Sequence, residues 1–227
     1  MRRILVAHGT RKASGVALIE RIADRVAGTL DQPVDVAFVD VVGPSPADVL
    51  QRTCDGPAVL VPAFLSRGYH VRTDIPEHIE ASGHPDVTVA AALGPDPQLV
   101  RVLSDRLIES GWRPDDSVIL AAAGTSDRGA LRDLHTTATW LSALTGGRVE
   151  LAFAATGTPR IADAVAAVRV RSGRRVVVAS YLLSEGLFQD RLRASGADVV
   201  TDPLGTHPGL VRLIASRFRR ARLPVAA

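Results

Sequence analysis

Three side chains capable of metal binding or proton transfer lie in the first half of the chain, each soon after an apolar segment. His8 and Asp40 follow such segments directly, and His70 lies in the polar, glycine-containing stretch after a third. Ligands of open α/β sheets bind outside the carboxyl ends of the strands, so these three side chains could converge in one crevice. Two imidazoles and a carboxylate suit Fe²⁺, Co²⁺, Ni²⁺ or Zn²⁺, and the same groups can accept protons.

The segment around His8 occurs twice. Residues 119–126 (ILAAAGTS) repeat residues 4–11 (ILVAHGTR) about half a chain later. Three further pairs of segments follow in the same order: 37–48 with 152–163, 61–70 with 179–188, and 93–101 with 204–212. Four pairs of matching segments in the same order indicate a tandem duplication.

The two copies differ at the polar positions. His8 aligns with Ala123, Asp40 with Ala155 and His70 with Phe188. The glycines and apolar residues around them persist in both copies. A structural triad would have been retained together with the structure, so the joint loss of all three favours a functional role for His8, Asp40 and His70.

The pattern of apolar segments predicts an α/β fold built from two tandem duplicated domains. Each domain is expected to hold a mainly parallel sheet of about four strands flanked by helices, with residues 1–113 and 114–227 as the two domains and 111–116 as the linker. The strands are expected at 4–7, 34–39, 58–63 and 87–91, then at 118–122, 149–154, 176–180 and 198–201. The helices are expected at 14–30, 47–53 and 95–110, then at 129–144, 161–170, 187–194 and 209–222. Residues 66–73 are expected to form a loop.

Composition excludes several classes of protein. A hydrophobic content of 46% with 22% charged residues is ordinary for a globular protein, and no apolar run reaches the roughly 18 residues needed to span a bilayer. The residues before His8 are too few for a signal peptide, so a cytoplasmic location is expected. The single cysteine, Cys54, excludes an internal disulfide. Net charge is +3 and aromatic residues are 4%, with no nucleic-acid-binding motif, so neither a nucleic-acid partner nor a membrane is predicted.

Four motifs together resemble one family. They are the HGTR that follows the first strand, the FVD at 38–40, the LGPDP at 93–97, and the most specific, VPAFLSRGYHVRTDIP at 61–76. This combination resembles the sirohydrochlorin chelatases, the class II cobalt and iron chelatases of the cobalamin and siroheme pathways, in their long two-domain form. The resemblance implies insertion of Fe²⁺ or Co²⁺, with Ni²⁺ as a third candidate, into sirohydrochlorin without ATP and without an organic cofactor. The lack of ATP use agrees with the sequence, because a Walker loop needs Gly-Lys-Ser/Thr and the only lysine, Lys12, follows Arg11.

The resemblance also implies roles for individual residues. The family histidines correspond to His8 and His70, to which metal delivery and proton removal are assigned together without dividing the two roles. Asp40 stands where the family usually has a glutamate and would complete the metal ligands. Sirohydrochlorin is a polycarboxylate tetrapyrrole, and four arginines are expected to bind its carboxylates: Arg11, Arg67, Arg72 and Arg128. The second domain would complete the cleft, and the intact chain is expected to be a monomer.

Two alternatives come from other classes of protein. His8-Gly9 after a strand is also found in histidine phosphatases, but those place an arginine directly before the histidine and this chain has Ala7. The second alternative, which the sequence does not exclude, is a protein that binds a tetrapyrrole or a metal without turnover. The sequence also leaves open which metal is physiological, and whether the product enters siroheme or cobalamin.

Overall fold

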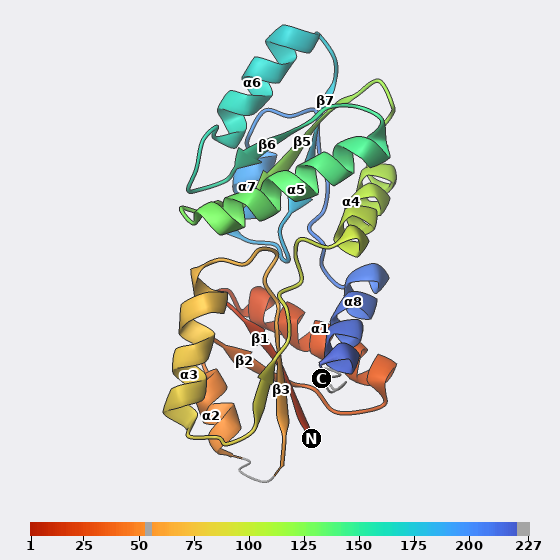
Figure 1. Cartoon of the computed structure of the whole chain (residues 1–227). Coiled ribbons are helices and arrows are strands. Elements are labelled where there is room, and N and C mark those ends of the chain that lie inside the picture. Colours follow the sequence, from red (N-terminus) through yellow and green to blue (C-terminus); the bar gives the residue numbers. More distant parts are fainter. Residues whose placement is uncertain (53–55, 222–227) are drawn as a thin grey trace. The chain divides into compact units, whose positions relative to one another are not determined.

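The computed structural model describes residues 1–52 and 56–221, which form two parallel four-stranded sheets (Figure 1). The strand order in the first sheet is β2-β1-β3-β4 and in the second β6-β5-β7-β8. The strands of the first sheet are β1 (Arg2–Ala7), β2 (Asp35–Phe38), β3 (Ala58–Pro62) and β4 (Val87–Val89). Those of the second are β5 (Ser117–Ala122), β6 (Val149–Phe153), β7 (Val176–Tyr181) and β8 (Val199–Val200).

Helices connect the strands in both halves, as parallel pairing requires. The first four are α1 (Ala13–Leu30), α2 (Pro46–Gln51), α3 (Ile75–Ser82) and α4 (Pro97–Glu109). The second four are α5 (Arg128–Thr145), α6 (Ile161–Ser172), α7 (Leu187–Arg193) and α8 (Pro208–Arg220). The same order of elements thus occurs twice, and the prediction of a duplicated α/β fold is confirmed.

The compact units of the structure do not follow the two halves of the sequence. One unit combines residues 1–94 with α8, and the other spans Pro95–His207. Accordingly α8 contacts α1 and β3, whereas α4 contacts α5 and β7. The predicted boundary at 113/114 therefore divides the repeats but not the compact units, because the last helix of each repeat packs against the sheet of the other. We call residues 1–94 with α8 the first unit, and Pro95–His207 the second unit.

Equivalent arginines dock the two exchanged helices. In the second unit, Arg106 of α4 donates a hydrogen bond to the carbonyl oxygen of Leu204 at 3.1 Å. In the first unit, Arg217 of α8 donates to the carbonyl oxygen of Leu93 at 3.3 Å. Leu93 and Leu204 are partners in the sequence repeat. The exchanged packing is therefore a property of the repeated unit, made the same way in both copies.

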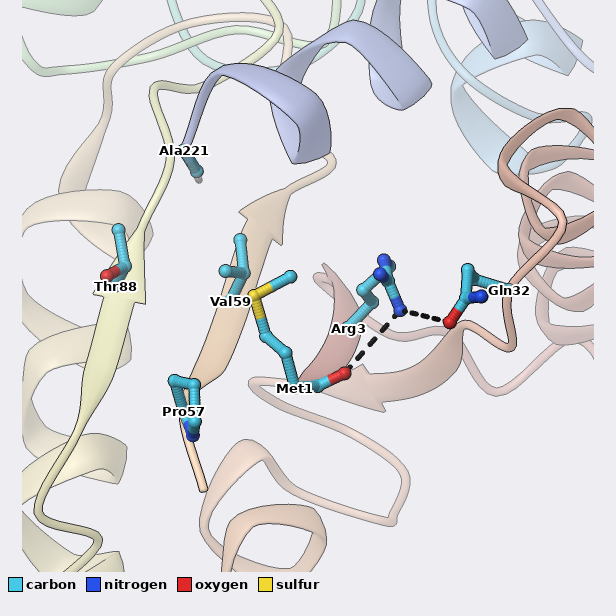
Figure 2. A pocket seen from close by; sticks show the side chains of 7 residues that line it. All are labelled: Met1, Arg3, Gln32, Pro57, Val59, Thr88 and Ala221. Carbon is cyan, nitrogen blue, oxygen red and sulfur yellow. Dashed lines mark hydrogen bonds between the residues drawn. The ribbon is translucent and has the colours of Figure 1, made fainter. Parts of the chain in front are cut away.

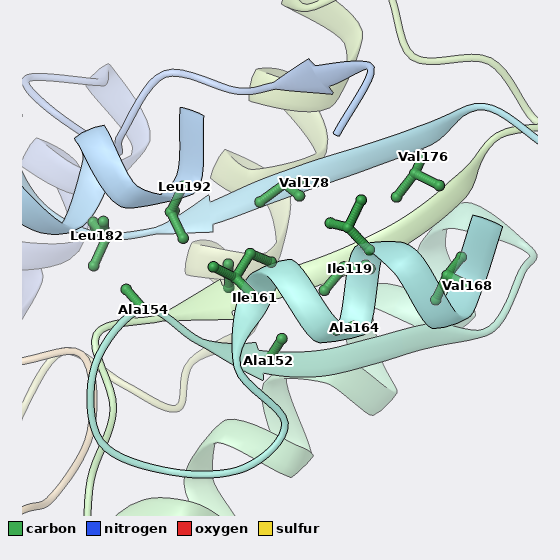
Figure 3. Close-up of a cluster of buried hydrophobic side chains, with 12 residues drawn as sticks. Ile119, Ala152, Ala154, Ile161, Ala164, Val168, Val176, Val178, Leu182 and Leu192 are labelled. Atoms are coloured by element: carbon green, nitrogen blue, oxygen red, sulfur yellow. The ribbon is translucent and has the colours of Figure 1, made fainter. Parts of the chain in front are cut away.

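Each sheet is covered on both faces by apolar side chains, as near-continuous hydrophobic strands require. In the first unit, one face of β1 and β3 packs against α2 and α3 through a cluster that includes Ile4, Val6, Leu60 and Ile75. In the second unit, α6 packs on the corresponding face of β5, β6 and β7 (Figure 3). These cores fix the strands, and the strand ends fix the side chains that follow them.

The structure differs locally from the predicted elements. The expected loop at 66–73 is a loop only in part, since a π-helical turn (η1, His70–Asp74) leads into α3, a helix that was not predicted. Strand β4 is shorter than expected. Three positions named in the sequence analysis lie outside the described residues: residue 53 at the end of the predicted helix 47–53, residue 222 at the end of the predicted helix 209–222, and Cys54.

Among the described residues, no helix is both long and apolar enough to cross a membrane.

A reciprocal cap begins α2, the helix that follows the Asp40 loop. The Ser45 hydroxyl accepts a hydrogen bond from the Asp48 amide at 3.1 Å. The Asp48 carboxylate in turn accepts bonds from the Ser45 amide and hydroxyl, both at 2.8 Å. These bonds to Ser45 lower the pKa of Asp48 from the ordinary carboxyl value of 3.8.

We expect Asp48→Asn to lower the free energy of unfolding at neutral pH. A carboxyl whose pKa is depressed by folding stabilises the native state above its unfolded value, and that contribution is lost as the pH falls through the folded value. The difference between the two chains should therefore shrink on acidification below 3.8. Denaturant unfolding between about pH 2 and about pH 7 measures it, and a difference that stays constant across this range would contradict the expectation.

Candidate functional site

His8 stands at the carboxyl end of the central strand β1. Residues 4–7 of β1 are buried, and His8 directly after them is exposed. Its carbonyl oxygen accepts a hydrogen bond from the Asp40 amide at 3.0 Å, and that of Ala7 accepts one from the Val39 amide, also at 3.0 Å. These two bonds extend the β1–β2 pairing beyond the strands, so the loops that carry His8 and Asp40 lie side by side.

Gly9 allows this close approach. Its φ of +103° is rarely adopted by residues with a side chain, and a Cβ placed there would lie 2.1 Å from the Asp40 carbonyl oxygen. The second unit repeats the arrangement, since Gly124 has a φ of +125° and its Cβ would lie 2.0 Å from the Thr156 carbonyl oxygen. The glycine thus persists in both copies for backbone reasons, although the histidine before it is present only in the first.

We expect Gly9→Ala to lower the free energy of unfolding by at least about 1–3 kcal/mol, the usual cost of a forced backbone conformation. The matched control is Gly28→Ala near the end of α1, where an added Cβ meets nothing within 4 Å. That change should be neutral or should stabilise by up to about 1 kcal/mol. Denaturant unfolding of both variants measures the difference, and equal stabilities would refute the close approach at Gly9.

The structure brings His70 against His8. The two ring centroids are 4.4 Å apart, and the ring planes meet edge to face at 65°. On another side, the Phe64 ring stacks on His70 with centroids 5.8 Å apart. Phe64 comes from the chain just after β3, and His70 begins the π-helical turn that follows. Two neighbouring strands, β1 and β3, therefore deliver the two imidazoles to one edge of the sheet.

Asp74 holds the His70 ring by a hydrogen bond between Asp74 Oδ2 and His70 Nδ1. The two residues are four positions apart, and the turn between them places both side chains on one side. Since a carboxylate accepts, Nδ1 donates, and the lone pair of His70 lies on Nε2. Histidines that bind metals are commonly oriented in this way by a carboxylate behind the ring. His70 keeps 33% of its side chain exposed while Asp74 keeps 19%, so the imidazole is accessible and its partner lies deeper.

Asp40 does not join the two histidines as a third ligand in this arrangement. Its side chain is exposed, and its Oδ1 accepts a hydrogen bond from the Val41 amide at 2.7 Å. Within residues 1–52 and 56–221, no group of three or more His, Cys, Asp or Glu side chains is placed to hold a metal ion. The predicted triad is therefore seen as a histidine pair with an aspartate on the adjacent loop.

The predicted substrate-binding arginines are all exposed. Arg11 lies between β1 and α1, Arg67 between β3 and the π-helical turn, and Arg72 within that turn. These three follow the same strand ends as the histidines, in the first unit. Arg128 is the first residue of α5 and belongs to the second unit.

Sequence reasoning missed two neighbours of His70 and a further histidine beside the Asp40 loop. Asp74 stands in the motif at 61–76, and its spacing of four from His70 would have indicated the contact had a helical turn been expected there. Phe64, in the same motif, supplies the stacked ring. His78 on α3 contacts the Val39 carbonyl oxygen through Nε2 at 3.3 Å, next to the Asp40 loop. No pattern at the sequence level signalled His78, because α3 itself was not predicted.

Comparison with known proteins agrees with this architecture. A family model described as CbiX matches residues 2–110 and again 117–221, once for each repeat. The sirohydrochlorin cobaltochelatase of Methanothermobacter thermautotrophicus is 29% identical over 126 residues, which cover 46% of this chain and 88% of that protein.

Two solved structures share the whole fold. SirB from Bacillus subtilis, solved with Fe³⁺, has a TM-score of 0.84 and 19% identity, covering 97% of this chain and 96% of its own. A CbiX described as the terminal enzyme for siroheme biosynthesis in denitrifying bacteria has a TM-score of 0.75 and 22% identity, covering 99% of this chain and all of its own. With both repeats matched by the family model, the chain belongs to the CbiX family, which confirms its resemblance to the sirohydrochlorin chelatases.

Proposed function

We propose that this chain inserts a divalent metal ion into sirohydrochlorin without ATP. The observation that carries the proposal is the pair of imidazoles, 4.4 Å apart, at the carboxyl edge of the first sheet, with Asp74 orienting one of them. The type of reaction is inferred from the family and from the cobaltochelatase relative, and the histidine pair provides side chains able to perform it.

Metal insertion requires the protein to deliver a metal ion and to accept protons. Insertion replaces two pyrrole N–H protons by one divalent cation, so two protons leave the macrocycle as the metal arrives. A neutral imidazole can release a bound metal to the macrocycle or accept a proton from it. His8 and His70 lie close enough to act on one macrocycle, and the Asp74 hydrogen bond keeps the lone pair of His70 on the nitrogen away from Asp74.

Either iron or cobalt fits this pair. Imidazole and carboxylate ligands bind both ions, and selectivity among divalent metals often rests on availability. We therefore propose Fe²⁺ and Co²⁺ as alternative substrates of one site, with the metal supply deciding which product forms. Asp40 is proposed to assist metal entry from the adjacent loop.

The carboxylates of sirohydrochlorin would be bound by arginines. Guanidinium groups match carboxylates through paired N–H donors, and Arg11, Arg67 and Arg72 follow the strand ends that carry the histidines. Arg128 is proposed to serve the same purpose from the second unit. Closure of the cleft by the second repeat, the monomeric state of the chain and its cytoplasmic location stay predictions.

The test is insertion itself. Sirohydrochlorin in excess is mixed anaerobically with Co²⁺ or Fe²⁺ and the chain, and the absorption change is followed against an enzyme-free control. Multiple turnovers per chain are expected. A stoichiometric spectral change that stops after one equivalent would instead identify a tetrapyrrole carrier, the alternative left open by the sequence.

Asp74→Asn should lower the insertion rate by about 10–100-fold, the range found when the group behind a ligating histidine is removed. The amide keeps the size of the side chain but cannot serve as a charged acceptor for the Nδ1 proton. Steady-state rates with either metal measure the effect. An unchanged rate would remove Asp74 from the mechanism and leave it a structural residue.

A further inference from the structure

A hollow of about 610 Å³ opens at the amino-terminal edge of the first sheet, opposite the edge that carries the histidines (Figure 2). Arg3, Val59 and Thr88 line it from three adjacent strands. The strand register pairs Arg3 with Val59 and Val59 with Thr88, so the three residues form one row across the sheet.

The hollow lies on the face of the sheet that α1 and α8 cover. Successive residues of a strand point to opposite faces, and Ile4 with Leu60 faces α2 and α3, so Arg3 with Val59 points to the other face. Helix α8 contacts β3 on that face, and Ala221, just after the helix, lines the hollow. The cover provided by α8 therefore ends beside this row of side chains.

Arg3 is the unusual residue in the hollow, because its charge is buried without an anionic partner among the described residues. It is 4% exposed, and its Nε is buried with no hydrogen-bond partner in the part of the chain that the structure describes. Its Nη1 donates two long hydrogen bonds to neutral acceptors, the Met1 carbonyl at 3.5 Å and Gln32 Oε1 at 3.4 Å, drawn as dashed lines in Figure 2. The preceding residue, Arg2, is paired with Asp35 at 2.7 Å.

A buried charge normally has a charged partner, because removal from water is costly and only a close counter-charge offsets it. The described part of the chain provides such a partner for Arg2 but not for Arg3. The Arg3 guanidinium is thus a buried cation that lines a hollow and has no counter-charge within residues 1–52 and 56–221. A volume of about 610 Å³ is ample for a small molecule.

We propose that this hollow binds a small oxyanion, a carboxylate or a phosphate group, with Arg3 as its charged partner. The guanidinium fork presents paired N–H donors that match either group. The Gln32 amide and the Thr88 hydroxyl can add neutral hydrogen bonds, while Val59 leaves an apolar wall for a short carbon chain. Partial negative charge at the carboxyl end of α8 is offset by basic residues in its last turn, among them Arg217 and Arg219. The site is independent of the proposed chelatase reaction.

The test uses the full chain and two probes, inorganic phosphate and succinate, each compared with sodium chloride at equal ionic strength. A ligand that binds only the native state raises the midpoint of thermal unfolding, by about 3–6 °C at about ten times its dissociation constant for a protein of this size. We expect a saturable rise with at least one probe. The probe that acts tells a phosphate site from a carboxylate site.

Arg3→Met should abolish this rise, and Arg2→Met should keep it. Arg3→Met replaces a buried charge that has no anionic partner among the described residues by an apolar side chain of similar length, so it should fold at least as well as the unchanged chain. The Nε–H resonance of Arg3 in the unchanged chain gives a second measurement, and it should shift on addition of the same probe. No rise above the chloride control with either probe, or a rise that survives in Arg3→Met, would overturn the proposal.

Discussion

Replacing His70 by alanine is expected to lower the rate of metal insertion into sirohydrochlorin by at least about a hundredfold, and His8→Ala should have an effect of similar size. Each variant removes one imidazole of the pair and leaves the other without its neighbour at 4.4 Å. Initial rates of insertion of Co²⁺ and of Fe²⁺, corrected for spontaneous insertion, measure the loss. Both side chains lie outside the buried core, so circular dichroism should show an unchanged fold.

His84→Ala is the matched control. His84 belongs to the same unit but lies in the turn between α3 and β4, at the amino-terminal edge of the sheet. Its Nδ1 only accepts a bond from the nearby Asp86 amide. The rate should stay close to that of the unchanged chain. Near-normal insertion by either His8→Ala or His70→Ala would remove that histidine from the proposed mechanism.

Phe218→Ala is expected to destabilise the first unit by about 3–5 kcal/mol, although Phe218 belongs to the second half of the sequence. Its side chain is fully buried, and it lies on α8, which packs against α1 and β3. Truncation removes this apolar contact and leaves a cavity. Amide hydrogen exchange followed by mass spectrometry should show loss of protection first in peptides from β1 and β3.

Leu103→Ala supplies the reciprocal comparison. Leu103 is fully buried on α4, which packs against α5 and β7 in the second unit. Protection should then be lost first in peptides from β5 and β7, at a cost of about 2–5 kcal/mol. If Phe218→Ala instead loosened β5 and β7 before β1 and β3, the assignment of α8 to the first unit would be wrong.

Much of the fold could be predicted because apolar periodicity and the repeat both act locally along the chain. The strands around residues 4–7 and 119–122 are buried on both faces, and such strands read as continuous apolar runs. The adjacency of His8 and His70 followed from parallel pairing of their strands, which brings carboxyl ends to one edge. The exchange of α4 and α8 could not be predicted, since the sequence shows that each helix has an apolar face but not which sheet that face covers.

The turn that holds His70 could not be predicted for a similar reason, since tertiary contacts determine it. The turn at His70–Asp74 has a proline two residues later and a mixture of polar and β-branched residues, a composition more typical of a loop than of a helix start. Its conformation is set by the contacts of His70 with His8, Phe64 and Asp74. For Asp40, the position of the backbone just after a strand could be predicted, but the direction of the side chain could not. The side chain accepts a hydrogen bond from its own loop.

The most direct measurement of the central claim is insertion by the double variant His8→Ala/His70→Ala with sirohydrochlorin in excess. If the imidazole pair is the reaction centre, the double variant should show no rate above the enzyme-free control with either Co²⁺ or Fe²⁺. Binding of sirohydrochlorin, followed by its absorption in the absence of metal, should persist, because the arginines proposed to bind its carboxylates are unchanged. Multiple turnovers by the double variant would contradict the account.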